Sequence, residues 1–220
     1  MKPWWDEPML VIDVETTGFG KSDRICQLGA THMQNRNLVR KYGQLVNPGR
    51  PIENSHIHNI TDEMVAGSEY MNEVASRFMK LADKFDVIGG YNLQFDNRMI
   101  DAETGGRWSE ILSNKIVIDG IKLVRLKMVG RFWRGKGRHK LANAANNLGI
   151  EIPDDLIMHQ ASSDCLVTGW VIHECVSGDA YRDEVREFLG PDGKIAQSRL
   201  EMTARDFDNH MKRFKEKTDA

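Results

Sequence analysis

The most constraining feature of this sequence is a short apolar segment near its start that carries two acidic residues. Residues 9–14 are apolar apart from Asp13, and they predict a buried β-strand. Glu15 lies two positions further on, so both carboxylates project from the same face of that strand. Burying unpaired charge is costly, and neighbouring carboxylates repel each other. We therefore expect a positive charge between Asp13 and Glu15, and a divalent cation is the simplest candidate.

Two more strand-like segments follow the first and are joined by a short turn. Residues 25–33 and 38–46 have the apolar patterns of strands, and Asn35-Arg36-Asn37 predicts the hairpin turn between them. Asn47-Pro48-Gly49 then ends the third segment. Because connections this short leave no room for a crossover, we expect three antiparallel neighbours.

After residue 50 the pattern changes to helices that alternate with strands. A short helix is expected to begin at residues 61–63. The further expected elements are a helix at 72–84, a strand at 87–91, a helix at 95–103 that stops at Gly105-Gly106, a strand at 116–118, and helices at 120–129, 141–148 and 161–176. Together the elements predict an α/β fold with a mixed five-stranded sheet, three antiparallel strands followed by βαβα units, flanked by helices.

Length and charge limit the domain organisation and the class of function. The chain has 220 residues, 40% of them apolar and 28% charged, which suits one domain with an appendage. We expect the domain over residues 1–190 and a charged, partly helical C-terminal tail over residues 191–220. The net charge of −2 argues against a protein that coats long nucleic acid, but it does not exclude an enzyme that grips a few nucleotides.

The cysteine content and the apolar runs indicate a cellular setting. The three cysteines show no C-x-x-C spacing, and residues 1–7 lack the pattern of a secretory leader, so a reduced cytoplasmic location is expected. No apolar run approaches the roughly 20 residues of a membrane span. We therefore expect no membrane partner.

Two more acidic motifs occur further along the chain. Asn92-Leu93-Gln94-Phe95-Asp96 follows a predicted strand and opens a predicted helix, at the edge where open α/β sheets bind ligands. His159 precedes the last long helix, and Asp164 lies about one turn inside it. Taken singly, each motif has an ordinary explanation, such as an acid favoured at a helix N-terminus or a histidine on the surface. Their joint occurrence in these contexts favours one shared site.

The three motifs resemble those of the DEDDh 3′→5′ exonucleases, the group that contains ribonuclease T and the proofreading subunit of bacterial replicative polymerase. The resemblance covers residues 8 to about 178 and implies a ribonuclease H-like fold with a DEDDh exonuclease domain over residues 1–190. The residues that it implies for catalysis are Asp13, Glu15, Asp96, His159 and Asp164.

The chemistry implied by the resemblance is metal-dependent phosphodiester hydrolysis. The four acidic residues are expected to hold two divalent ions, and oxygen-only ligands favour Mg²⁺ or Mn²⁺. His159 is expected to be the general base, because an unperturbed imidazole titrates near pH ~6.5. The expected reaction removes nucleoside 5′-monophosphates from single-stranded or mismatched DNA 3′ ends.

Several residues near the three motifs are expected to contact the substrate. Thr16 and Thr17 are candidates for bonds to the terminal 3′ hydroxyl and phosphate, and Phe19 for stacking on a base or for ordinary packing. Ile57 and His58 resemble part of the family's V-H-G-I-T stretch, although Asn59 replaces the usual glycine. Asn92 of the second motif completes the set.

Some alternatives stay open at the level of sequence. The same chemistry could act on RNA 3′ ends or short oligoribonucleotides, and a non-enzymatic reading is a nucleic-acid-binding or polymerase-tethering module. The basic, aromatic stretch at residues 131–140 suits single-stranded nucleic acid or is a solvated loop. The tail from Lys194 is a candidate docking segment for a polymerase or other replication protein, or a solvated helix. Oligomeric state is not encoded in any recognisable feature.

Overall fold

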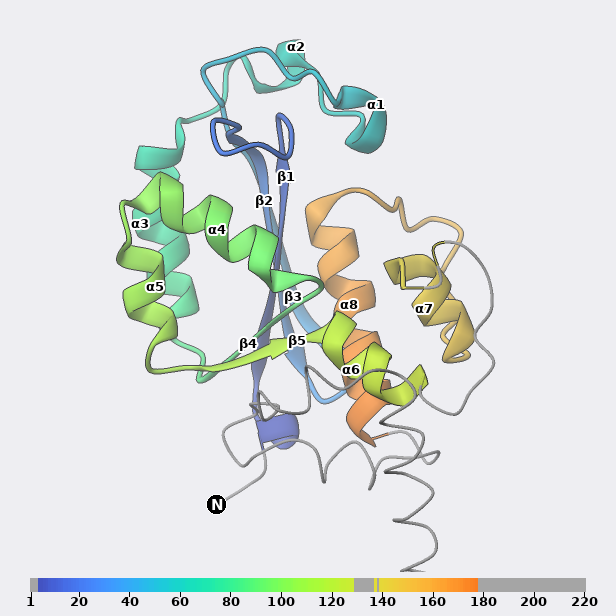
Figure 1. Cartoon of the computed structure of the whole chain (residues 1–220). Helices are drawn as coiled ribbons and strands as arrows, with labels where there is room; N and C mark the ends of the chain where they lie inside the picture. Colours follow the sequence, from blue (N-terminus) through green and yellow to red (C-terminus); the bar gives the residue numbers. More distant parts are fainter. Residues whose placement is uncertain (1–3, 129–136, 138, 178–220) are drawn as a thin grey trace, which may run out of the picture.

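A five-stranded mixed sheet forms the centre of the protein, whose computed structural model describes residues 4–128, 137 and 139–177 (Figure 1). The strands are β1 (Met9–Thr16), β2 (Ile25–Gln34), β3 (Asn37–Leu45), β4 (Val87–Gly90) and β5 (Ile116–Asp119). They lie in the order β3-β2-β1-β4-β5. The first three are antiparallel, while β4 is parallel to both β1 and β5. The predicted mixed sheet is therefore confirmed.

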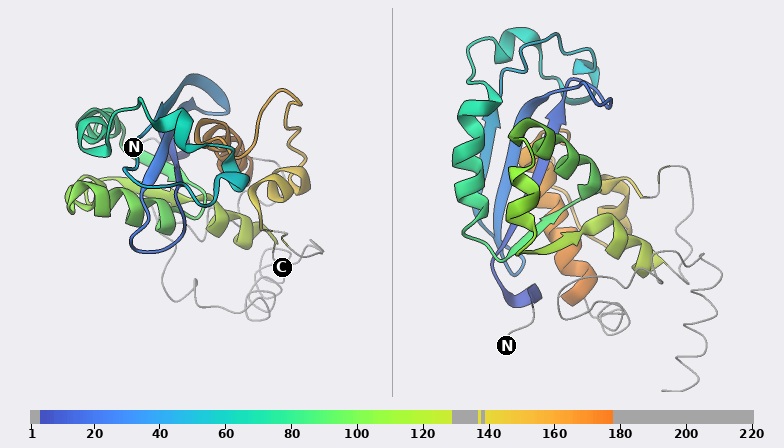
Figure 2. Two further views of the ribbon diagram at one scale, coloured as in Figure 1. Left: turned by 90° about the horizontal axis from the view of Figure 1, so that it is seen from above. Right: turned by 60° about the vertical axis from the view of Figure 1, so that its left-hand side comes forward.

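Helices cover the two faces of the sheet (Figures 1 and 2). One face packs against α3 (Met71–Ala82), α4 (Leu93–Thr104) and α5 (Arg107–Leu112) through a shared apolar cluster. The other face packs against α6 (Gly120–Met128), α7 (Leu141–Asn147) and α8 (Ala161–Ser177). The short helices α1 (Ser55–His58) and α2 (Asp62–Val65) lie beyond the end of β1 and β2, and the 3₁₀ helix η1 (Trp4–Asp6) lies at the opposite end.

The alternation of side chains in β1 decides which residues meet which helices. Leu10 and Ile12 pack in the cluster with α3 and α4, whereas Met9 and Val11 pack in the cluster with α8. Because side chains alternate along a strand, Asp13 is on the α8 face. The apolar segment is thus buried on both sides, and its acidic residue faces a helix.

Two helices and several boundaries differ from the prediction. The sequence did not predict α1 and α5, because α1 has only four residues and α5 begins directly after the Gly105-Gly106 stop. Both of these glycines have positive φ, 62° and 88°, so they end one helix and redirect the chain into the next. Helix α4 begins at Leu93, two residues before the predicted start.

Parts of the predicted organisation lie outside the described residues. Of the basic stretch at 131–140, the structure describes Gly137, His139 and Lys140, and the tail at 191–220 is outside it. The boundary at residue 190 therefore stays a prediction. Within the described part of the chain, none of the helices combines the length and apolar character that crossing a membrane requires.

Candidate active site

The close docking of α8 on β2 brings the last acidic motif to the first. Gly29 lies opposite Asp13 in the sheet, and a Cβ atom at Gly29 would come within 2.3 Å of the backbone carbonyl carbon of Ala161. The side chains two positions either side of Gly29 fasten the same helix end. Gln27 Oε1 accepts a hydrogen bond from the Ala161 N–H at 2.9 Å, and Thr31 Oγ1 donates one to the Ser162 carbonyl at 3.3 Å. The start of α8 is thereby held against β2.

Three carboxylates meet where α8 docks. Oxygen atoms of Asp13, Glu15 and Asp164 all lie within 4.8 Å of one another, and the three residues are half-buried. Because no cation of the chain pairs with any of these carboxylates among the described residues, their charges are not balanced by a salt bridge. A donor set of this kind fits a hard divalent ion.

The electrostatics of the cluster favour the protonated acids when no cation is present. Burial raises the pKa of Asp13 well above its usual value, and repulsion from Asp96, Glu15 and Asp164 raises it further. Burial, followed by repulsion from Asp164 and Asp96, raises the pKa of Glu15 to about 8. Burial also raises the pKa of Asp164. The fold holds these carboxylates together against their own repulsion, which a bound cation would relieve.

Asp96 is held beside the cluster by the backbone of β1. Strand β4 pairs with β1 only as far as Val11, so the N–H of Val14 has no strand partner on that side. Asp96, in the first turn of α4 and only 3% exposed, accepts a hydrogen bond from this N–H at 3.0 Å. Burial raises the pKa of Asp96 to about 7, although the Val14 bond opposes the shift. Asp96 is therefore adjacent to the cluster, but its oxygens are not among those that meet within 4.8 Å.

A fifth acidic residue, Asp119, supports this arrangement, although the sequence motifs did not indicate it. Its Oδ1 atom accepts hydrogen bonds from the N–H groups of Asn92 at 2.8 Å and Ile121 at 3.3 Å. It thereby caps the starts of both α4 and α6 from the end of β5. Asn92 takes a left-handed conformation, φ 65°, which aims the chain from β4 into α4. The available signal was an acid directly after the apolar residues 116–118.

His159 lies at the rim of the cluster. Its backbone N–H donates a hydrogen bond to Asp164 Oδ1 at 3.0 Å, and its φ is 61°. The residue is exposed, in the loop that precedes α8. The structure therefore brings His159 next to Asp164, in the place that the motif predicts.

The predicted substrate-contacting residues that follow Glu15 differ in their exposure and in their hydrogen bonds. Thr16 Oγ1 donates to the Gly18 carbonyl and Thr17 Oγ1 to Asp23, so both hydroxyls are engaged inside the β1–β2 loop. Phe19 is 66% exposed, and its ring contacts that of Phe95 with centroids 5.9 Å apart. The predicted contacts of all three with substrate stay predictions.

His58 has a structural task that the sequence did not indicate. It is buried, its Nδ1 accepts the Ile60 N–H at 3.1 Å, and its Nε2–H therefore donates to the Thr16 carbonyl at 3.2 Å. Ile57, beside it, is half-exposed. Asn59 has φ 59°, a left-handed conformation that asparagine tolerates, which explains how it replaces a glycine. The predicted substrate contacts of Ile57, His58 and Asn92 stay predictions.

Comparison with known proteins agrees with the motifs. Residues 10–171 match the model of the family described as exonuclease. The DNA polymerase III subunit epsilon of Treponema pallidum is 29% identical over 160 residues, which are 70% of this chain and 70% of that protein. A DNA polymerase III PolC-type of Pediococcus pentosaceus is 33% identical over 189 residues, which are 82% of this chain but only 12% of the relative. The chain thus spans a small part of its PolC-type relatives.

Solved structures show the same fold at low sequence identity. E. coli Exonuclease I in complex with a dT13 oligonucleotide has a TM-score of 0.66 at 19% identity, over 83% of this chain and 43% of that chain. Exonuclease X in complex with 5′ overhanging duplex DNA has a TM-score of 0.60 at 22% identity, over 80% and 95% of the two chains.

The sheet topology and these neighbours define an α/β protein of ribonuclease H-like fold with an acidic site at the end of its first strand. The chain belongs to the exonuclease family, whose model matches most of its length. The predicted fold class and the predicted enzyme class are confirmed at this level.

Proposed function

We propose that the protein is a metal-dependent 3′→5′ exonuclease that removes nucleoside 5′-monophosphates from single-stranded or mismatched DNA 3′ ends. The observation that carries the proposal is the meeting of Asp13, Glu15 and Asp164, with Asp96 fastened beside them. A complete set of acids at one site also argues against a module that only binds nucleic acid.

The four acids are proposed to hold two Mg²⁺ or Mn²⁺ ions, since their ligand atoms are all oxygens. Ions bound there would stabilise the charge on the attacking and leaving oxygens of the phosphodiester. Asp96 keeps one oxygen on the Val14 N–H, so its other oxygen is the one available to a ligand.

His159 is proposed as the general base. Water attacks the phosphorus, the bond from phosphorus to the 3′ oxygen breaks, and the proton of the water passes to the imidazole. The leaving 3′ oxygen takes a proton from solvent, so the products are a nucleoside 5′-monophosphate and a shortened strand with a new 3′ hydroxyl. The hydrogen bond from the backbone N–H of His159 to Asp164 supports this role, because it holds the histidine beside an acid of the cluster.

The names of the relatives support DNA as the substrate. One is a subunit of a DNA polymerase, and the two solved structures are complexes with DNA. A polymerase partner is proposed on the same ground, without assigning its contact to the tail. The cytoplasmic location expected from the cysteines stays a prediction.

Labelled oligonucleotides test the proposal. With Mg²⁺, a 5′-labelled single strand should yield a ladder of products, whereas a 3′-labelled strand should release its label at once as a mononucleotide. Excess chelator should abolish both, and an RNA strand of the same sequence tests for tolerance of a 2′ hydroxyl. Binding without cleavage, or the reverse pattern of labels, would contradict the proposal.

A further inference from the structure

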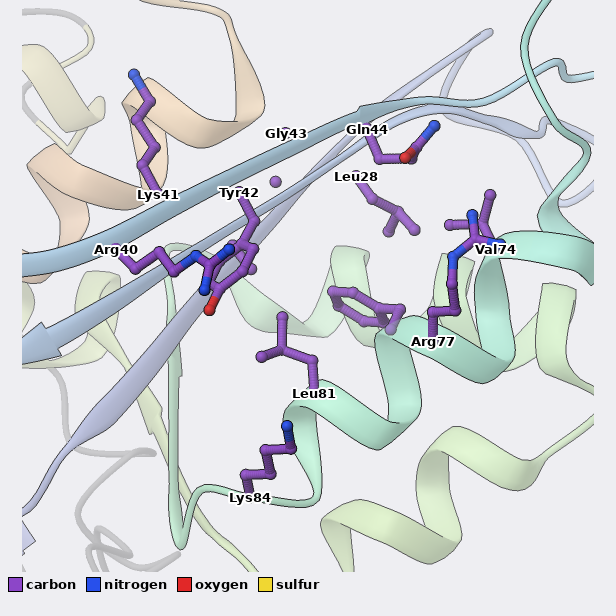
Figure 3. A pocket seen from close by; sticks show the side chains of 13 residues that line it. Leu28, Arg40, Lys41, Tyr42, Gly43, Gln44, Val74, Arg77, Leu81 and Lys84 are labelled. Carbon is purple, nitrogen blue, oxygen red and sulfur yellow. The ribbon is translucent and has the colours of Figure 1, made fainter.

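A groove on the face of the sheet opposite the carboxylates has no part in the proposed chemistry. It lies between β3 and α3 and has a volume of about 540 Å³ (Figure 3). That size is within the range of protein sites for small ligands and anchored side chains. Apolar side chains contributed by β2 and α3, namely Leu28, Val74, Phe78 and Leu81, line its interior.

The groove is open because α3 does not reach across the edge strand. Strand β3 is the last strand on its side of the sheet and is largely exposed along its length. Tyr42 and Gln44 of β3 form one wall, at positions that share a face of the strand. The wall formed by α3 runs from Val74 to Leu81, about 10 Å at the rise of a helix. That length would accommodate about three residues of an extended chain.

The charged residues that line the groove are all basic: Arg40, Lys41, Arg77 and Lys84. Arg77 is paired with Glu69, and Lys41 turns to the other face, where its Nζ lies 3.1 Å from Ser163 Oγ. Arg40 lies over the Tyr42 ring, 5.0 Å from its centroid, and Lys84 follows the end of α3. Neither Arg40 nor Lys84 forms an ion pair with a described residue, so both can bind a negatively charged partner.

The edge of β3 offers a second mode of contact. An edge strand presents backbone N–H and C=O groups that can pair with an added strand. Leu38 and Val39 of this strand are 45% and 55% exposed, so they can add apolar contacts to a strand that pairs with this edge. The basic groove, the exposed apolar residues and the open edge therefore adjoin one another along β3.

We propose that this groove, with the β3 edge, binds an acidic extended segment of a partner protein. The partner would add a strand to β3 and direct its acidic side chains to Arg40 and Lys84 and its apolar side chains between Tyr42 and Leu81. The inference does not depend on the proposed nuclease activity.

Two other occupants fit less well. Antiparallel pairing of β3 with the same strand of a second copy, about its middle residue, would place Lys41 of one copy directly opposite Lys41 of the other, and like charges opposite each other destabilise a sheet. A nucleic acid strand would be expected near the carboxylates, but the Asp13 side chain is on the α8 face, whereas the groove lies on the α3 face.

The test uses a fluorescein-labelled peptide of repeated Glu-Ser-Leu-Ser, in which glutamate and leucine lie on one face of an extended strand. It is titrated with the full chain and followed by fluorescence anisotropy. Its lysine-for-glutamate counterpart and a dT oligonucleotide serve as probes of charge and of nucleic acid. We expect the acidic peptide to bind and the basic one not to bind, with no competition from the oligonucleotide. Bound peptide should also slow hydrogen exchange of the backbone in β3.

Single charge reversals locate the site. Arg40→Glu and Lys84→Glu should each weaken peptide binding about tenfold, through loss of an attraction and gain of a repulsion. Lys80→Glu, the same change on an exposed position of α3 outside the groove, should leave binding unchanged. All three variants should cleave DNA, if the wild type does, at the wild-type rate.

The proposal is overturned if the acidic peptide does not bind, if Lys80→Glu weakens binding as much as the groove variants do, if hydrogen exchange in β3 is unchanged, or if the oligonucleotide displaces the peptide. The last would make the groove a nucleic-acid site. A dimer in solution that Arg40→Glu disrupts would make it a self-association surface instead.

Discussion

The clustered acids predict an unusual dependence of stability on pH when divalent ions are removed. The pKa of Glu15 is about 8 in the folded chain, against 4.5 ordinarily, so the folded protein holds this proton more tightly than the unfolded chain does. The resulting stabilisation is complete below pH about 4.5 and is lost as the pH rises through about 8. Stability in chelator should therefore fall between pH 5 and pH 8.

The size of the effect follows from the shift. Moving a pKa from 4.5 to about 8 corresponds to about 5 kcal/mol, and water at this half-buried site reduces that to a few kcal/mol. For a chain of this length, a loss of that size lowers Tm by roughly 5–10 °C. A divalent ion should restore Tm, and more strongly at pH 8 than at pH 5, because it replaces protons that are no longer bound.

Thermal melts of three proteins in chelator and in Mg²⁺ check this reasoning. Glu15→Gln removes one charge from the cluster, so its Tm in chelator should depend less on pH and respond less to Mg²⁺. Glu53→Gln makes the same change on an exposed acid and should behave as the wild type. A wild-type Tm in chelator that stays level or rises from pH 5 to pH 8 would refute the argument from repulsion.

Three further predictions concern single residues of the site. His159→Ala should retain Mn²⁺ binding by calorimetry but lose about 10²–10⁴-fold in kcat, and a rate near wild type would exclude it as the base. Asp119→Asn keeps an acceptor oxygen for the two N–H groups, so this variant should stay active. Asp119→Ala should lose about 1–3 kcal/mol of stability and much of its rate. Equal losses of stability and rate in the two variants would contradict a capping role. Gly29→Ala forces α8 away from β2 and should lower Tm and activity together. Gly67→Ala should change neither, because a Cβ atom at position 67 would have no atom within 4 Å. A Gly29→Ala protein with unchanged Tm and activity would refute the close docking of α8.

The sequence predicted the sheet and the acidic motifs because both depend on local patterns. Period-two burial placed Asp13 and Glu15 on one face, and turn and strand signals separated the hairpins from the βαβα units. The order of the motifs placed Asp96, His159 and Asp164 in the correct elements.

What the sequence did not reveal depends on contacts between distant elements. Asp119 caps two helices, but its place in the sequence, directly after a short apolar run, does not indicate this role. The need for glycine at position 29 arises from α8, far along the chain, and the inward bonds of Thr17 depend on the shape of its loop. The groove was also invisible, because it exists only where α3 leaves β3 uncovered.

The docking of α8 on β2 has a consequence for biosynthesis. Asp13 belongs to the first strand, but Asp164 belongs to the last described helix, which must be complete before it can lie against Gly29. A nascent chain on the ribosome therefore carries an unfinished acidic site until almost the whole domain has emerged. The proposed nuclease activity would therefore arise only at the end of folding.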